Sequence, residues 1–168
     1  MKIFKSSITI LITILVFTGL NNACLKGTDP EQAEMELLAK YLAGNNITED
    51  PKPSGLYYLE TKEGSGLAPV IGDTVAINYI GKDLLQNVFD TNIEEKANEY
   101  GIYDMTRTYE PFRFKLGDSL IISGLSEGVS YMKEGGTATL ILPSKIAFQN
   151  YQTIIYDVEL LEVIKTSN

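Results

Sequence analysis

The sequence predicts an α+β fold in which a mostly antiparallel, twisted β-sheet wraps on one short helix, with an additional helix near the N-terminus. Two stretches predict half-buried strands, because apolar residues alternate with polar or small ones over residues 75–79 and 154–160. Between them, Leu125, Val129 and Met132 recur at the i, i+4 and i+7 spacing of a helix. One sheet and one helix can enclose the single core expected of a 168-residue chain.

The segment before the only cysteine is typical of an export signal. Lys2 and Lys5 precede an apolar run over residues 8–17, which is too short to span a bilayer comfortably. Ala23 and Cys24 end a segment that resembles a bacterial lipoprotein signal. This resemblance implies removal of residues 1–23, a lipid on Cys24, and anchoring of an exported protein to a bacterial membrane, expected to be the outer membrane. The alternative is an ordinary cleavage site followed by an incidental thiol.

Residues 24–53 are expected to form a lipid-anchored tether, a helix and a linker. Asp29 and Pro30 predict the helix start, since aspartate caps a first turn and proline suits its first position. Gln32 resembles the second member of a capping box, and Gly44 predicts the end. The apolar positions at helical spacing are Met35, Leu38, Tyr41 and Leu42. This face either packs on the main domain or binds a partner, and the oligomeric state stays unknown.

Residues 54–168 are expected to form the main domain. The stretch 45–54 contains many turn-forming residues and predicts the linker that leads into it. Further strands are predicted at residues 56–60, 112–116 and 137–142. Gly135 and Gly136 predict the end of the central helix.

The composition excludes several kinds of chemistry. The chain has no histidine and one cysteine, which excludes His/Cys metal sites, Ser-His-Asp triads and intrachain disulfides. Its net charge of −8 disfavours binding to nucleic acid. No metal or cofactor is expected, so any reaction has to use carboxylates, phenols or shaped apolar surface.

Short blocks over some 110 residues, taken in order, resemble the FKBP-type peptidyl-prolyl isomerase family. One block is Asn78-Tyr79-Ile80-Gly81, which stands where the family has His-Tyr-Thr-Gly, and Phe89-Asp90 follows at the expected distance. The remaining blocks resemble the family's entry strand and turn, central helix and closing strand: Ser54 to Tyr58, Gly72 to Val75, Pro111 to Phe114, Ile121 to Leu125, and Tyr156 to Leu161.

The resemblance implies a site for a proline-containing peptide. The residues implied for catalysis are Tyr79, Phe89, Asp90, Ile122, Phe148 and Tyr156. Those implied for substrate binding are Phe112, Ile121 and Leu125. In this assignment the Ile122 backbone N–H holds a substrate carbonyl, and Asp90 lies beside the rotating amide. Taken singly, each aromatic residue is better explained as part of the core, whereas their joint placement favours the site.

The sequence departs from the family pattern in the walls of this site. Leu125 stands where many members have tryptophan, and Phe148 replaces a tyrosine. The connection from Phe148 to the last strand is much shorter than is common in the family, whereas residues 91–110 are longer than the corresponding loop. The longer stretch is either a flap that selects substrates or a surface excursion with a short helix. Arg107 and Arg113 are both candidates for the basic residue that braces the aspartate.

Two functions follow from the resemblance. The first is a peptidyl-prolyl cis-trans isomerase that assists the folding of exported proteins, where slow X-Pro bonds limit maturation. The second is a weakly catalytic or non-catalytic module that binds proline-containing segments or acts as a chaperone. In either case the partners are proline-containing polypeptides and, through the lipid on Cys24, a membrane. The short loop after Phe148 favours the second function.

Overall fold

The computed structural model describes residues 29–166, so the predicted export signal and Cys24 lie outside the described residues. Within residues 29–166, no helix combines the length and the hydropathy needed to cross a membrane.

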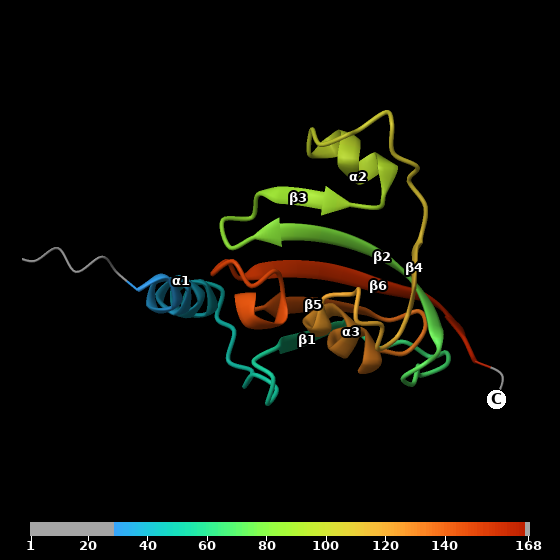
Figure 1. Ribbon diagram of the computed structural model, residues 1–168, viewed down its shortest axis with the longest axis horizontal. Helices are drawn as coiled ribbons and strands as arrows, with labels where there is room; N and C mark the ends of the chain where they lie inside the picture. Colours follow the sequence, from blue (N-terminus) through green and yellow to red (C-terminus); the bar gives the residue numbers. More distant parts are fainter. Residues whose placement is uncertain (1–28, 167–168) are drawn as a thin grey trace, which may run out of the picture.

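The strands form one antiparallel, twisted sheet in the order β1-β5-β6-β2-β3 (Figure 1). The two longest strands, β2 (Thr74–Asp83) and β6 (Ile154–Ile164), pair along their length, with an irregularity after Ala76. The other edge of β6 pairs with β5 (Thr137–Leu142), which in turn pairs with β1 (Tyr57–Lys62). The other edge of β2 pairs with two short strands, β3 (Val88–Thr91) and β4 (Phe112–Lys115). The β3 and β4 strands take opposite ends of the same β2 edge. The predicted α+β architecture is therefore confirmed.

The helix α3 (Ser123–Ser130) covers one face of the sheet and closes the main core. Leu125 and Val129 of this helix pack with Leu140 and other apolar residues whose side chains alternate along β2, β5 and β6. Close packing depends on Gly128, because a Cβ at this position would overlap the Leu140 side chain. The core thus forms between the sheet and one helix, as the alternating pattern predicts.

The prediction that this helix continues to Gly135 and Gly136 is wrong. The helix ends at Ser130, because Tyr131 and Met132 donate backbone hydrogen bonds to residues only three positions back, which tightens the last turn and stops it. Met132 still lies in the core, beyond the helix end.

The helix α1 (Pro30–Gly44) packs on the opposite face of the sheet. Leu38 is buried against Ile141 and Ile155, whose sequence neighbours on the same strands face α3. Met35, predicted to share this buried face, is instead 54% exposed, and Glu34 is buried in its place. The packing interpretation is therefore correct for α1 as a whole and wrong for Met35.

The start of α1 is capped as predicted, whereas two details of its ends differ. The Asp29 carboxylate accepts from the Glu31 backbone N–H at 3.1 Å. Gln32 does not complete a capping box, because its side chain donates to Glu36 one turn later. Gly44 is the last helical residue, and the left-handed residue that turns the chain is Asn46, with φ of 55°.

Three short elements were either not predicted or predicted without bounds. The strand β3 is short, and α2 (Glu94–Glu99) is the short helix of the longer 91–110 stretch. A 3-10 turn, η1 (Ser144–Ile146), follows β5 and leads into the loop that carries Phe148. Figure 1 shows α2 beyond the β3 edge of the sheet, on the side away from β1.

Candidate active site

Five aromatic residues meet at the β3 end of the sheet and are called the aromatic cluster: Tyr79, Phe89, Phe112, Phe148 and Tyr156. Tyr79 lies at the centre, edge-to-face with Phe112 at 6.0 Å and with Tyr156 at 5.5 Å between ring centroids. Phe89 continues the series toward Tyr156 at 6.2 Å and Phe148 at 6.5 Å. Edge-to-face contacts at these distances are favourable, so the rings form one continuous apolar surface.

The cluster runs from buried to open. Tyr79 and Tyr156 are buried, whereas Phe89 is 43% and Phe148 50% exposed. An exposed pair of phenylalanines beside a buried pair of tyrosines offers apolar contact to another molecule, and isolated core packing does not account for it.

Strand pairing explains why these rings meet. Gly81 on β2 pairs with Asp90 on β3 and with Tyr156 on β6. A Cβ at Gly81 would lie 2.8 Å from the Tyr156 ring and 3.0 Å from the Phe89 ring. The absent side chain therefore leaves the space that both rings occupy across the strand.

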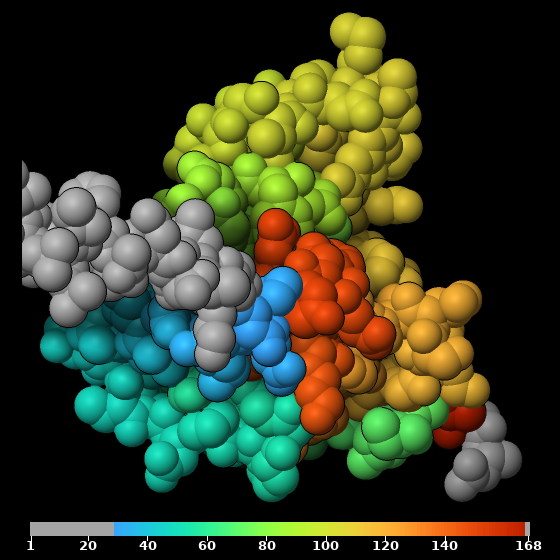
Figure 2. Space-filling view, turned by 60° about the vertical axis from the view of Figure 1, so that its left-hand side comes forward, coloured from blue at the N-terminus to red at the C-terminus, as the bar shows by residue number. Residues whose placement is uncertain are grey.

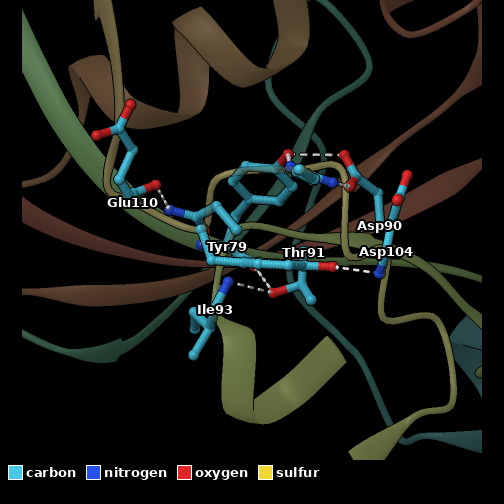
Figure 3. A network of polar contacts seen from close by, with 9 residues as sticks. Tyr79, Asp90, Thr91, Ile93, Asp104 and Glu110 are labelled. Atoms are coloured by element: carbon cyan, nitrogen blue, oxygen red, sulfur yellow. Dashed lines mark hydrogen bonds and ion pairs between the residues drawn. The ribbon is translucent and has the colours of Figure 1, made fainter. Parts of the chain in front are cut away.

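The aspartate predicted beside the cluster holds a three-residue polar network (Figure 3). The Tyr79 hydroxyl donates to Asp90 Oδ2 at 2.7 Å. Arg107 donates from one guanidinium nitrogen to Asp90 Oδ1 at 2.5 Å and from the other to the Tyr79 hydroxyl oxygen at 3.1 Å. Charge-assisted bonds of this kind fix the orientation of both partners. The network therefore holds the Tyr79 ring in place at the centre of the cluster.

Burial and this network set the protonation of the site. Burial, followed by the hydrogen bond to Asp90, raises the pKa of Tyr79 to about 12, although Arg107 acts in the opposite direction. Burial also raises the pKa of Tyr156, and the hydrogen bond to Asp90 raises that of Arg107. Both phenols are therefore neutral and the guanidinium charged at any physiological pH.

The choice between the two candidate arginines is settled by their contacts. Arg107 pairs with Asp90, whereas Arg113 pairs with Glu162 at 2.7 Å on the exposed surface. The residue that braces Asp90 therefore comes from the long 91–110 stretch. No sequence pattern distinguished Arg107 from Arg113 for this role.

The residue that attaches this stretch to the sheet is Asn92, which the sequence did not single out. Its side chain accepts from the Tyr79 backbone N–H at 2.8 Å and donates to the backbone oxygens of Ile77 and Glu110 at 3.0 Å. It therefore ties β2 to both ends of the stretch, as Figure 3 shows around Tyr79 and Glu110. The contact depends on strand pairing, so an asparagine after a short strand gives no local signal for it.

The rest of the 91–110 stretch is held by its own contacts. Tyr103 and Tyr109 stack at 5.5 Å, and the Tyr109 hydroxyl accepts from the Asp104 backbone N–H at 2.9 Å. The Arg107 guanidinium lies 5.5 Å from the Tyr109 ring centroid. These contacts place the stretch as a fixed support for Arg107, next to the aromatic cluster.

The predicted aliphatic residues lie on the α3 side of the cluster. Ile121 and Ile122 are partly buried against the core that contains Tyr79 and Tyr156. Leu125 is 5% exposed and belongs to the same core. Among the hydrogen bonds between residues 29–166, none uses the Ile122 backbone N–H as donor. This group can therefore serve a ligand.

Comparison with known proteins gives the family. A sequence model of the FKBP-type peptidyl-prolyl cis-trans isomerases matches residues 66–161, more than half of the chain. The chain belongs to this family. The probable FKBP-type peptidyl-prolyl cis-trans isomerase FkpA of Neisseria meningitidis serogroup B is 34% identical over 119 residues, which is 66% of this chain and 38% of that protein. The chloroplastic isomerase FKBP16-3 of Arabidopsis thaliana is 35% identical over 95 residues, 56% of this chain and 37% of that protein.

The fold of this FKBP-type chain also matches a solved relative. The crystal structure of FkpA from Escherichia coli aligns with a TM-score of 0.61 at 27% identity, over 82% of this chain and 64% of that one. The chain thus spans less than two fifths of the length of the two sequence relatives named above.

Proposed function

We propose that this FKBP-type chain is a peptidyl-prolyl cis-trans isomerase whose substrates are proline-containing polypeptides. The observation that carries the proposal is the half-open aromatic cluster braced by Tyr79, Asp90 and Arg107 in a member of this family.

The arrangement suits the physics of the reaction. Rotation about an X-Pro bond crosses a barrier of roughly 18 to 20 kcal/mol, because amide resonance is lost in the twisted state. No nucleophile or metal is needed if the site binds the twisted amide better than either planar form. An apolar aromatic surface favours the twisted amide, whose charge separation is smaller than that of the planar form. The Ile122 N–H can hold the substrate carbonyl on one side while the braced Tyr79 ring positions the proline on the other.

A second candidate is a binding or chaperone module with little catalysis. The side chain of Phe148 favours this candidate, because it is 50% exposed at the edge of the site and has no hydroxyl to bond a substrate carbonyl. Losing one such hydrogen bond costs on the order of 1 kcal/mol, which slows the reaction about fivefold to tenfold without abolishing binding.

We also propose that the main domain comprises residues 54–168 and that the protein assists the folding of exported proteins from a membrane. The domain bounds rest on the turn-rich stretch 45–54. Export and anchoring rest on the sequence of residues 1–24 alone, where a basic start, an apolar run and Ala23-Cys24 resemble a lipoprotein signal. In a bacterial host, Cys24→Ser should move the protein from the membrane fraction to the soluble exported fraction. Membrane retention of the variant would rule out the lipid on Cys24.

A protease-coupled assay on a proline tetrapeptide separates the two functions. An isomerase accelerates the slow phase of cleavage in proportion to the concentration of the chain. A rate equal to that in buffer, together with measurable peptide binding, identifies the binding module.

Two variants with matched controls test the assignment of the site. Phe89→Leu should lower kcat/KM about tenfold, since it removes two aromatic contacts and part of the apolar surface. Its control is Tyr131→Leu, an aromatic residue of similar exposure outside the cluster. Asp90→Asn should also lower kcat/KM. Asp157→Asn removes the ion pair of a similarly exposed aspartate with Lys82 and should not lower it. Unchanged turnover in both site variants would refute the assignment.

A further inference from the structure

A groove of about 460 Å³ lies beside the aromatic cluster and is called the α1 groove. Its apolar lining comes from three separate segments: α1 with Leu37, the β2–β3 hairpin with Leu84 and Leu85, and the 144–153 loop with Phe148 and Tyr151. Figure 2 shows the start of α1, in blue, against the orange-red 144–153 loop. The groove therefore exists only because α1 docks on the domain.

The α1 groove is continuous with the aromatic cluster. Phe89 and Phe148 belong to both, and their rings lie 6.5 Å apart. A polypeptide whose proline contacts the cluster therefore has the groove next to it, on the Phe148 side. This continuity identifies the occupant as the same polypeptide and not a separate ligand.

The lining is unusually exposed for large apolar residues. Leu37 is 58%, Leu85 79% and Tyr151 56% exposed. Three such side chains from three segments converge on one hollow, whereas single exposed apolar residues scattered over a surface are ordinary. The free energy falls when another molecule covers such a concave apolar surface and removes it from water.

Buried polar contacts hold the wall of the groove in a strained shape. Gln149 and Tyr151 have φ of 55° and 61°, a left-handed conformation that is unfavourable for both residue types. The Glu34 carboxylate accepts from the Ser144 N–H at 2.6 Å and from the Thr153 hydroxyl at 2.7 Å. The Ser144 hydroxyl in turn accepts from the Tyr151 N–H at 2.7 Å. The loop is thus fixed with Tyr151 at the groove, and strain of this kind is commonly retained at binding sites.

The polar groups at the groove disfavour acidic side chains of a substrate. Glu34 is already occupied by its two donors, and the Asp83 carboxylate accepts from Leu85, Asn87 and the Asn87 side chain. Both are acidic, and no basic residue is among the residues that line the groove. An acidic side chain would meet uncompensated repulsion there, while a large apolar one would meet only apolar surface and satisfied polar groups.

We propose that the α1 groove binds large apolar side chains of the substrate polypeptide near its proline, so that α1 extends the substrate site beyond the aromatic cluster. This inference rests on the proposed function and names the substrate class: X-Pro segments flanked on one side by apolar residues.

The test uses labelled proline peptides of three kinds with the full chain. One is a short tetrapeptide, and two are the same peptide extended at both ends by leucine-rich or by serine-rich residues. Binding is measured by fluorescence anisotropy and turnover by the coupled assay. The leucine-rich peptide should bind about tenfold more tightly than the serine-rich one, because one or two of its apolar side chains are transferred from water into the groove.

Variants locate the preference. Leu37→Ser and Leu85→Ser should each reduce the leucine-to-serine affinity ratio severalfold. Leu67→Ser, a leucine of similar exposure to Leu37 outside the groove, should leave the ratio unchanged. Equal affinity of the wild-type chain for both extended peptides would overturn the inference, as would an unchanged ratio in both groove variants.

The readouts distinguish this failure from failure of the proposed function. Turnover of the tetrapeptide at the buffer rate would refute the isomerase, while the affinity ratio still decides on the groove. Sedimentation should show a mass that does not depend on Leu37. A dimer that dissociates in Leu37→Ser would assign the groove to a second copy of the chain and overturn the inference.

Discussion

Glu34 joins α1 to the loop that carries Phe148, and removing its carboxylate should loosen both. Glu34 is 7% exposed, and its carboxylate is the acceptor for two donors of the domain, the Ser144 N–H and the Thr153 hydroxyl. The Glu34→Ala variant leaves both donors buried without a partner, at about 1 to 3 kcal/mol each. Relief from burying a charge offsets part of this cost. We therefore expect the free energy of unfolding to fall by about 3 kcal/mol.

The chemistry of the side chain can be separated from its size. Glu34→Gln keeps an acceptor of the same shape and loses only the charge assistance, so its loss should be about 1 kcal/mol. Glu36→Ala is the matched control, because Glu36 is an exposed glutamate on the same helix whose carboxylate accepts from the exposed Gln32 side chain. Its effect should stay within about 0.5 kcal/mol.

Urea unfolding followed by far-UV circular dichroism measures these differences, since the chain has no tryptophan to report by fluorescence. The order Glu34→Ala, then Glu34→Gln, then Glu36→Ala, from most to least destabilised, is the expected result. Equal stabilities of Glu34→Ala and Glu36→Ala would refute the reasoning, because the buried carboxylate would then contribute no more than an exposed one.

Three further predictions concern the site and the C-terminal end of the sheet. Replacing Arg107 with methionine should lower kcat/KM about threefold to tenfold, because the Tyr79 hydroxyl loses its hydrogen bond from Arg107. The same change at Arg113 should leave turnover unchanged, and the coupled assay compares the two variants. Ionisation of the Tyr79 and Tyr156 phenols should not change turnover between pH 6 and 10, because the pKa of Tyr79 is raised to about 12 and that of Tyr156 is raised too. A loss of activity with an apparent pKa near 10 that disappears in Tyr79→Phe would contradict this prediction. Hydrogen bonds, first from the Val70 N–H and then from Lys165, lower the pKa of Asp73 from 3.8 to about 2, so its stabilising effect is complete above pH 4 and is lost as the pH falls toward 2. Asp73→Asn should therefore be less stable than the wild type at pH 7 and should approach it near pH 2 in denaturant titrations.

Local patterns in the sequence predicted the two long strands and the start of α1. Period-two alternation over residues 75–79 and 154–160 predicted the two long strands, because successive side chains of a strand face opposite sides of the sheet. The Asp29-Pro30 start predicted α1 for the same local reason, since capping involves only residues in one turn. The ordered family blocks placed the aromatic residues that the structure brings together in the cluster.

Contacts between distant segments could be decided only by the tertiary structure. Whether Arg107 or Arg113 braces Asp90 depends on which one the strand pairing brings within reach, and nothing in either local sequence records it. The burial of Glu34 in place of Met35 has the same origin, because Ser144 and Thr153 supply its donors from more than 100 residues away.

The sequence by itself therefore determined the fold class, the family and the aromatic composition of the site, all of which depend on spacing along the chain. The tertiary structure decided which arginine pairs with Asp90, the hydrogen bonds that Asn92 makes to β2 and Glu110, and the groove beside α1. These features consist of hydrogen bonds and apolar contacts between segments far apart in sequence, whose energies depend on distance in space and leave no periodic trace in the chain.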